Sequence, residues 1–257
     1  MGLAKHAFAA IKEADVVLEV VDARFADIMQ NRPLEKELVR RGKIVVLILN
    51  KMDLLPKDIP RVTRTFSDDL KIVSISCTPK KNIRLLRTLL FSLLPHGGKI
   101  AVVGYPNAGK SCVINALAGR HAAPTSKQAG FTRGRSMIKL KEDTYLLDTP
   151  GVIPLAERDE FRLVLVNAKS PNQVKNPQTA AEQLLEWLPT HPHWGTWIQR
   201  QYGVDLEGAD GYECLENLAV KLNRLRKGGL PDTRAMALKL LLDWQQGAKP
   251  IFPGKAN

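Results

Sequence analysis

Residues 104–111 have the types and spacing that phosphate binding requires, and they read Gly-Tyr-Pro-Asn-Ala-Gly-Lys-Ser. This G-x-x-x-x-G-K-S pattern follows the apolar run 100–103, a predicted buried strand, and precedes a predicted helix that begins at Cys112. Its two glycines let the backbone fold closely round an anion, and the helix N-terminus directs N–H groups at that anion. Lys110 supplies a positive charge for the phosphates, and the Ser111 hydroxyl suits Mg²⁺. The sequence therefore predicts a phosphate-binding loop.

A second motif, Asn-Lys-Met-Asp at 50–53, follows the apolar run 43–49. Ligands of open α/β sheets bind outside the carboxyl ends of the strands, so a motif at this position can reach a ligand. The Asp53 carboxylate can accept hydrogen bonds from N1–H and the exocyclic amine of guanine, whereas adenine offers neither donor there. The Lys51 stem would lie over the base, and Asn50 would brace neighbouring loops. Four residues alone are a weak signal, but after a buried strand and beside a phosphate loop they favour guanine recognition.

A third motif, Asp-Thr-Pro-Gly at 148–151, ends a predicted β-hairpin formed by 136–140 and 144–147. Asp148 would hold Mg²⁺, through a water molecule, and the Gly151 N–H would meet a γ-phosphate. A threonine in the preceding loop should complete that shell; Thr132 is the first choice and Thr125 the alternative. The other interpretation of this motif is an ordinary turn.

The elements that must position these motifs follow from hydrophobic periodicity. Apolar strands separated by helices or loops predict an α/β fold with a mainly parallel sheet and one antiparallel edge hairpin. The predicted strands are 15–22, 43–49, 71–76, 100–103, 136–140 and 144–147, and the predicted helices are 3–13, 34–41, 61–70 and 82–94. From Ile153 the pattern changes to helices only, at 178–188, 194–202, 211–226 and 231–246. We therefore expect one domain at 1–152 and a small all-α domain at 153–257.

Composition limits the class of protein. The 257 residues are 44% hydrophobic and 25% charged, as in proteins with a buried core, and no apolar run is long enough to cross a bilayer. The amphipathic start does not read as a secretory signal, and three scattered cysteines are typical of reduced thiols, so a cytoplasmic location is expected. The net charge of +12 falls almost wholly before residue 152, which points to a nucleic-acid partner or to a solvated basic surface.

The order of the motifs is informative, because an ordinary small GTPase begins with its phosphate loop. Here the order is 50–53, then the loop 76–78, then 104–111, Thr132 and 148–151, which is a circular permutation. On these residues the chain resembles the circularly permuted GTPases of the YlqF/RbgA ribosome-assembly family. The resemblance extends to DVVLEVVDAR, NKMDLLP, VGYPNAGKS, AGFTR, LLDTPGV and the C-terminal PDTRAMALKLLLDWQQGAK. The chain departs from the family pattern at 26–30 and at Cys77-Thr78, where the family has a proline-containing turn and Ser-Ala-Lys.

The resemblance implies a circularly permuted Ras-like P-loop GTPase domain that converts GTP to GDP with Mg²⁺. The implied GTP-binding residues are Asn50, Lys51, Asp53, Ser76, Cys77, Thr78, Tyr105, Pro106, Asn107, Ala108, Gly109, Lys110, Ser111, Cys112, Thr132, Pro150 and Gly151. The implied catalytic residues are Lys110, Asn107, Thr132 and Gly151, and the implied Mg²⁺ ligands are Ser111, Thr132 and Asp148. Asn107 would help to hold K⁺ against the phosphates, or would only shape the turn. No side chain at 152–156 can orient water, so the intrinsic rate should be slow and be raised by K⁺ and by a ribosomal partner.

The family's partners are the large ribosomal subunit precursor and its rRNA, and we expect a monomer with no membrane association. The basic residues that would meet RNA are Lys127, Arg133, Arg135, Lys139 and Lys141 near the threonine loop, and Lys221, Arg224, Arg226 and Lys227 in the tail. For each group the alternative is a solvated face. Two other functions remain open: an RNA-binding scaffold that uses GTP as a structural ligand, and an ATP-using P-loop enzyme, which Asp53 disfavours.

Overall fold

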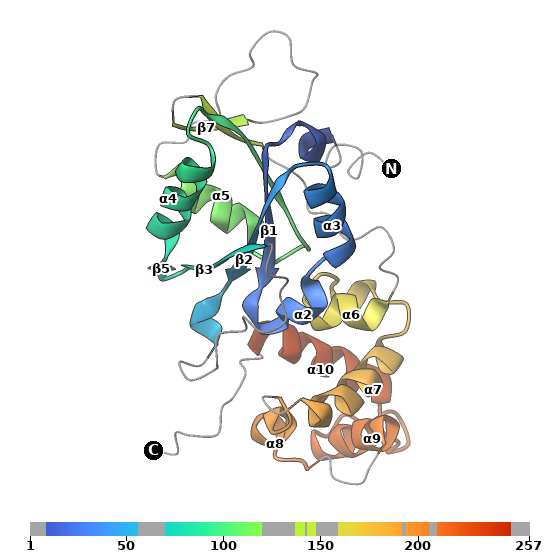
Figure 1. Cartoon of the computed structure of the whole chain (residues 1–257). Coiled ribbons are helices and arrows are strands. Elements are labelled where there is room, and N and C mark those ends of the chain that lie inside the picture. The colour runs from blue at the N-terminus through green and yellow to red at the C-terminus, as the bar shows by residue number, and fades with distance from the viewer. Residues whose placement is uncertain are drawn as a thin grey trace. The chain divides into compact units, whose positions relative to one another are not determined.

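The computed structural model describes residues 9–55, 70–119, 137–141, 143–147, 159–191, 194–205 and 210–247. Contacts within the chain divide it into two compact units. Unit 1 comprises residues 1–55 and 59–156, and unit 2 comprises residues 56–58 and 157–257. Figure 1 shows the strands in unit 1 and a group of helices in unit 2.

Unit 1 is built on a six-stranded sheet with the strand order β3-β2-β1-β6-β8-β7. All neighbouring pairs are parallel except β7 and β8, which form an antiparallel hairpin at one edge. The predicted mainly parallel sheet with one antiparallel edge hairpin is therefore confirmed. The strands are β1 (Val16–Asp22), β2 (Ile44–Asn50), β3 (Lys71–Ser74), β6 (Gly98–Val103), β7 (Met137–Lys141) and β8 (Thr144–Leu147).

Helices on both sides of the sheet explain why its central strands are almost wholly apolar. All seven residues of β1 and six of the seven in β2 are buried, as expected for strands covered on both faces. Figure 1 shows α4 and α5 on one side of the sheet and α3 on the other. The helices of unit 1 are α2 (Ala26–Met29), α3 (Arg32–Arg40), α4 (Ile83–Leu93) and α5 (Lys110–Ala118), and residues 9–13 are also helical.

The strand predicted at 71–76 is two separate elements. β3 ends at Ser74, and β4 (Ser76–Cys77) pairs antiparallel with β5 (Lys80–Lys81) in a small sheet of its own. The reason is that β2 ends at Asn50, so Ser76 has no β2 residue beside it with which to pair. Ile75 is the last residue to bond on this side: its N–H donates to Leu49 O (2.8 Å), and its carbonyl oxygen accepts from Met52 N–H (3.2 Å), just beyond the end of β2.

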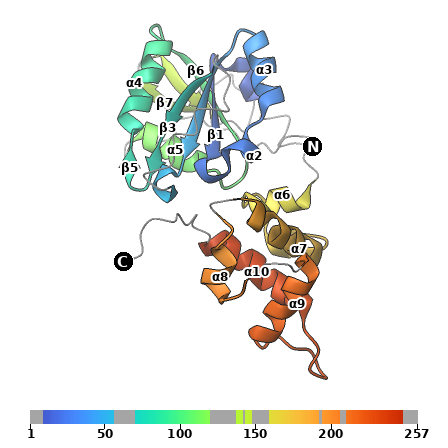
Figure 2. The same ribbon diagram turned by 60° about the horizontal axis from the view of Figure 1, so that its bottom comes forward.

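Unit 2 is helical in its described residues and packs round a group of tryptophans. Trp244 lies 4.6 Å from Trp194 and 5.2 Å from Trp197 between ring centroids, and all three are buried. Figure 2 shows α7, α9 and α10 packed together. The helices are α6 (Glu160–Leu165), α7 (Pro177–Trp187), α8 (Trp197–Tyr202), α9 (Gly211–Lys221) and α10 (Thr233–Gly247).

The sequence predicted only helices for this unit but gave no bounds for α6. This helix has six residues, and the Asp159 side chain caps its N-terminus by accepting a hydrogen bond from Arg162 N–H. The prediction of a helix over 211–226 is wrong at its end, because α9 stops at Lys221 and the chain turns at Asn223, where φ is +52°. No helix in the described part of the chain is both long enough and apolar enough to cross a membrane.

Candidate functional site

The predicted site lies where β1, β2 and β6 end side by side. The parallel register sets Asp22, the last residue of β1, opposite Asn50, the last residue of β2. β6 pairs with the other edge of β1, with Glu19 opposite Val103, and the phosphate loop follows directly. Because these carboxyl ends share one edge of the sheet, motifs that are far apart in sequence meet there.

Two glycines of the phosphate loop lie where no side chain fits. A Cβ atom on Gly104 (φ +137°) would lie 2.2 Å from the carbonyl oxygen of Val20. A Cβ on Gly109 (φ +98°) would lie 2.1 Å from Asn50 Nδ2. Gly109 is also the residue that precedes α5, whose first N–H groups have no helical acceptors. The loop is therefore a close backbone cradle at a helix N-terminus, which fits the phosphate group of a nucleotide.

Lys110 is the first residue of α5, so the helix begins two residues before the predicted start at Cys112. Its ammonium group donates a hydrogen bond to Tyr105 O at 2.6 Å, across the loop. Burial lowers the pKa of Lys110 to about 8, because the charged form loses solvation without gaining an anion. A phosphate bound in the loop would supply that anion.

The Asn-Lys-Met-Asp motif holds the phosphate loop directly. Asn50 is buried and donates from Nδ2 to Ala108 O at 3.0 Å. Lys51 adopts a left-handed backbone conformation (φ +64°) and donates from Nζ to Asn107 O at 2.9 Å. These two bonds bring the predicted guanine reader and the phosphate loop together across 58 and 56 residues of sequence.

Asp22 holds Lys51 in this position, a role in the site that was not predicted from the sequence. It is 1% exposed, and its Oδ2 lies 2.8 Å from Lys51 Nζ and 2.7 Å from Arg24 Nη2. Burial alone would raise the pKa of Asp22, but Arg24 and Lys51 outweigh it and leave that pKa below its usual value. The signal in the sequence was an acidic residue at the end of a buried strand, two residues before an arginine.

Asp53, the last residue of the motif, is exposed and accepts a short hydrogen bond from the hydroxyl of Ser76. The predicted base loop 76–78 therefore lies beside the predicted guanine reader. Cys77 and Cys112 are adjacent, and burial together with Cys112 raises the pKa of Cys77 to about 12. Cys77 is thus held as a neutral thiol at the junction of the base loop and α5, while Thr78 is exposed.

A buried carboxyl pair beside the phosphate loop was also missed. Glu19 is 2% exposed, and its Oε1 accepts from Asn31 N–H at 2.7 Å, which ties β1 to the start of α3. Burial and the neighbouring Glu35 raise the pKa of Glu19 well above its usual value. Glu19 lines a small cavity with Gly104 and Tyr105, so this buried carboxyl group borders the phosphate loop.

The remaining predicted residues are placed as follows. Asn107 (φ +61°) and Ser111 are exposed at the mouth of the loop, and Pro106 is half-buried. Lys139 and Lys141 are exposed on β7, and Arg224, Arg226 and Lys227 are exposed in the turn after α9, where Lys221 instead donates to Gly203 O. Outside the described residues lie Thr125, Lys127, Thr132, Arg133, Arg135, Asp148, Pro150 and Gly151. Among the residues that are described, no three His, Cys, Asp or Glu side chains gather into a metal-binding group.

Comparison with known proteins finds relatives that are named as GTP-binding proteins. A family described as "50S ribosome-binding GTPase" matches residues 99–186. An uncharacterized GTP-binding protein of Methanocaldococcus jannaschii is 36% identical over 242 residues, covering 92% of this chain and 63% of that protein. The nuclear GTP-binding protein NUG1 of Saccharomyces cerevisiae is 30% identical over 279 residues, covering 92% of this chain and 53% of that protein. The chain thus spans about half to two thirds of the length of these relatives.

Solved structures show the same fold. The GDP-bound structure of YlqF from T. maritima has a TM-score of 0.64 and 22% identity, and covers 93% of this chain and 92% of that one. The GNP-bound structure of the same protein has a TM-score of 0.64 and 21% identity, and covers 96% of this chain and 94% of that one.

Proposed function

We propose that the chain is a circularly permuted GTPase of the YlqF group, and that it binds and hydrolyses GTP as a switch in large-subunit ribosome assembly. The observation that carries the proposal is the pair of hydrogen bonds from Asn50 and Lys51 to the phosphate loop. They join the Asn-Lys-Met-Asp motif directly to the phosphate loop. The Asp53 carboxylate would be of no use to a P-loop protein that binds ATP, because adenine offers no donor for it at this position.

The nucleotide would be held at both ends, at its base and at its phosphates. Asp53 would accept from the guanine, with Ser76 fixing one of its oxygens, and the residues 76–78 would border the base. The backbone of 105–112 and the Lys110 ammonium group would hold the phosphates. Mg²⁺, bound by Ser111, Thr132 and Asp148, would neutralise charge on the transferred phosphoryl group.

Slow hydrolysis is part of the proposal, because Val152 to Ala156 include no side chain that can orient the attacking water. Asn107 lies exposed in the phosphate loop, and we assign it to a K⁺ ion that stabilises the phosphates. Full activity would then need a ribosomal partner. The rRNA would meet the basic residues near Thr132 and those after α9, with residues 153–257 as the RNA-binding domain.

The names of the relatives support the ribosomal half of the proposal. The matching family is named for binding the 50S ribosomal subunit, and further relatives are the GTPase grn1 of Schizosaccharomyces pombe and the nucleolar GTP-binding protein 2 of Neurospora crassa. The +12 charge of this chain suits a polyanionic partner.

The test is GTP hydrolysis in KCl and in NaCl, with and without purified large ribosomal subunits. The proposal expects a slow rate alone, a faster rate with subunits, and a preference for K⁺ that Asn107→Ala abolishes. GTP binding without hydrolysis under every condition would instead favour a scaffold that uses the nucleotide as a structural ligand. Equal affinity for ATP and GTP would contradict the guanine assignment.

A further inference from the structure

One long stretch of unit 1 contains no acidic residue. Between Asp69 and Glu142 there is no aspartate or glutamate, and every charged side chain other than the histidines is lysine or arginine. The stretch includes β3 to β6 together with α4 and α5, the two helices that lie on one side of the sheet. A surface made from this stretch has no carboxylates of its own to neutralise it.

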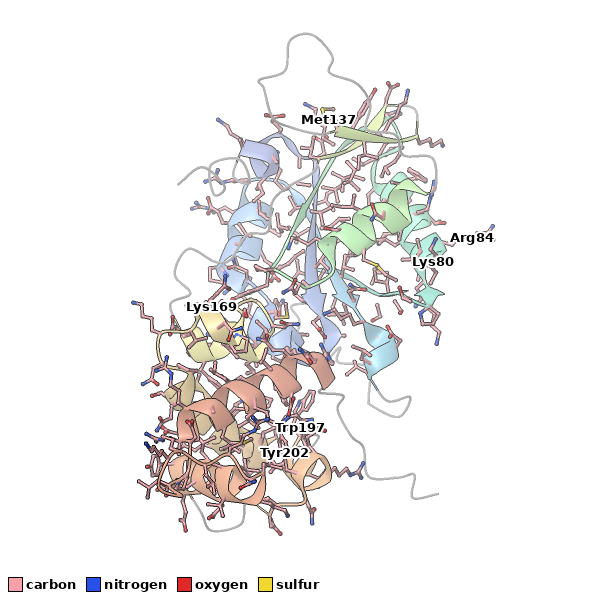
Figure 3. The ribbon with its side chains drawn as sticks, turned by 180° about the vertical axis from the view of Figure 1, so that it is seen from behind. Lys80, Arg84, Met137, Lys169, Trp197 and Tyr202 are labelled. Carbon is pink, nitrogen blue, oxygen red and sulfur yellow. The ribbon has the colours of Figure 1, made fainter. Side chains whose placement is uncertain are left out.

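The cations gather at the β4–β5 hairpin and along α4. Lys80, Lys81 and Arg84 are all exposed, and within the described residues none of them forms an ion pair. Figure 3 shows Lys80 and Arg84 at the same edge of unit 1, with both side chains directed outward. Their charges are therefore available to a partner.

The basic surface continues along one face of α4. Arg84, Arg87 and Phe91 are spaced i, i+3 and i+7, so they lie on the same side of the helix. Arg87 Cζ lies 5.8 Å from the centre of the Phe91 ring, and Lys141 Nζ from β7 lies 5.4 Å from it. Arg87 is fixed by a hydrogen bond to Leu117 O at 3.0 Å. From Arg84 to Phe91 this face of α4 extends about 10 Å, at about 1.5 Å per residue.

We propose that this surface, defined by Lys80, Lys81, Arg84, Arg87 and Lys141 round Phe91, is a binding site for the phosphate backbone of an RNA strand. A group of cations from β5, α4 and β7, with no acidic residue in the same stretch of sequence, matches the charges of a polynucleotide, and the planar arginines suit phosphate oxygens. The proposal deepens the proposed function, since it places the RNA partner on the nucleotide-binding unit, beside Ser76 and Asp53.

The first test measures binding of a fluorescent RNA hairpin over a series of salt concentrations. The variant carries Lys80→Ala, Lys81→Ala and Arg84→Ala. The matched control carries Lys36→Ala, Arg40→Ala and Arg41→Ala, which removes equal charge from exposed positions at α3. We expect the variant to bind RNA about tenfold more weakly and its salt dependence to fall by about 2 in slope, with the control unchanged.

The second test uses the unaltered protein. Acylation of lysine amines, read by mass spectrometry, should be suppressed by RNA at Lys80 and Lys81 and not at Lys36. Affinity for GTP is measured on every variant, so a failure of nucleotide binding is distinguished from a failure of this surface.

Either of two results would overturn the proposal. One is an equal loss of RNA affinity in the variant and the control, which would mean nonspecific attraction. The other is unchanged RNA binding by the variant together with lost binding to vesicles of anionic phospholipid, which would assign the surface to a membrane.

Discussion

Lys51 Nζ lies 2.8 Å from Asp22 Oδ2 and 2.9 Å from Asn107 O, so a single ammonium group joins the end of β1 to the phosphate loop. The carboxylate of Asp22 is almost fully buried, whereas the Lys51 side chain is 26% exposed. The buried partner therefore sets the position of the exposed one. Asp22 thus holds the Lys51 side chain beside the phosphate loop.

The first prediction concerns Asp22→Asn. Loss of the carboxylate leaves Arg24 and Lys51 without their anion, so we expect the free energy of unfolding to fall by about 1–3 kcal/mol and GTP affinity to fall at least tenfold. Isothermal titration and denaturant unfolding measure the two effects. Glu37→Gln is the control, because Glu37 also pairs with two arginines but on the exposed face of α3. Equal effects from both variants would contradict a role for Asp22 in the site.

The effect of Asp22→Asn on the free energy of unfolding should depend on pH. The pKa of Asp22 is lowered in the folded protein, so its contribution to stability is complete above its unfolded pKa of about 3.9 and is lost as the pH falls through the folded pKa. The difference in free energy of unfolding between wild type and Asp22→Asn should therefore be constant near neutral pH and shrink in acid. A difference that grows on acidification would be incompatible with this assignment.

The lowered pKa of Lys110 leads us to expect that the protein takes up a proton when the nucleotide binds. The Lys110 pKa of about 8 leaves part of the population neutral just above neutral pH, and a phosphate beside this residue would favour the charged form. GTP affinity should fall as the pH rises through about 8. Calorimetry at that pH in buffers of different ionisation enthalpy should show proton uptake. An affinity that stays constant across this range would mean that the phosphate does not contact Lys110.

Asp53→Asn tests the guanine assignment. The amide donates where the carboxylate accepted, so it faces the guanine N1–H and amine with a donor of its own. We expect GTP affinity to fall about 100-fold or more. Xanthosine triphosphate, which carries an oxygen in place of that amine, should bind the variant better than it binds wild type. If GTP binds both forms equally, the base lies elsewhere.

Gly104→Ala tests the close approach of the phosphate loop to β1. The added methyl group would lie 2.2 Å from the Val20 carbonyl oxygen, so the loop and strand must separate. Gly42→Ala is a matched control, because Gly42 also has a positive φ (+71°) but has no atom within 4 Å of the added Cβ. We expect the control to lose about 1–2 kcal/mol through backbone conformation alone, and Gly104→Ala to lose more. Equal losses in thermal unfolding would contradict the packing argument.

The sequence determined the sheet and the chemistry of its motifs, because both are local. A run such as Ile44–Leu49 is typical of a strand covered on both faces, and Gly104 to Ser111 has the spacing of a phosphate loop. Two of the wrong boundaries, the strand predicted through residue 76 and the end of α9, fall where a strand has no neighbour and where Asn223 takes a left-handed conformation. The hydrophobic periodicity of a single stretch reveals neither the missing neighbour of a strand nor the left-handed conformation of one residue.

Only the tertiary structure decided which residues work together. In the sequence Asp22 is only the polar end of a predicted strand. In the structure it lies opposite Asn50 in the parallel register, where it pairs with Lys51. Nothing in the sequence indicates that Lys80 and Arg84 belong to one surface. In the structure the β4–β5 hairpin and α4 bring them to the same edge of unit 1. The physical reason is the same in both cases: ion pairs and surface charge depend on distance in space, and the sequence specifies that distance only through the fold.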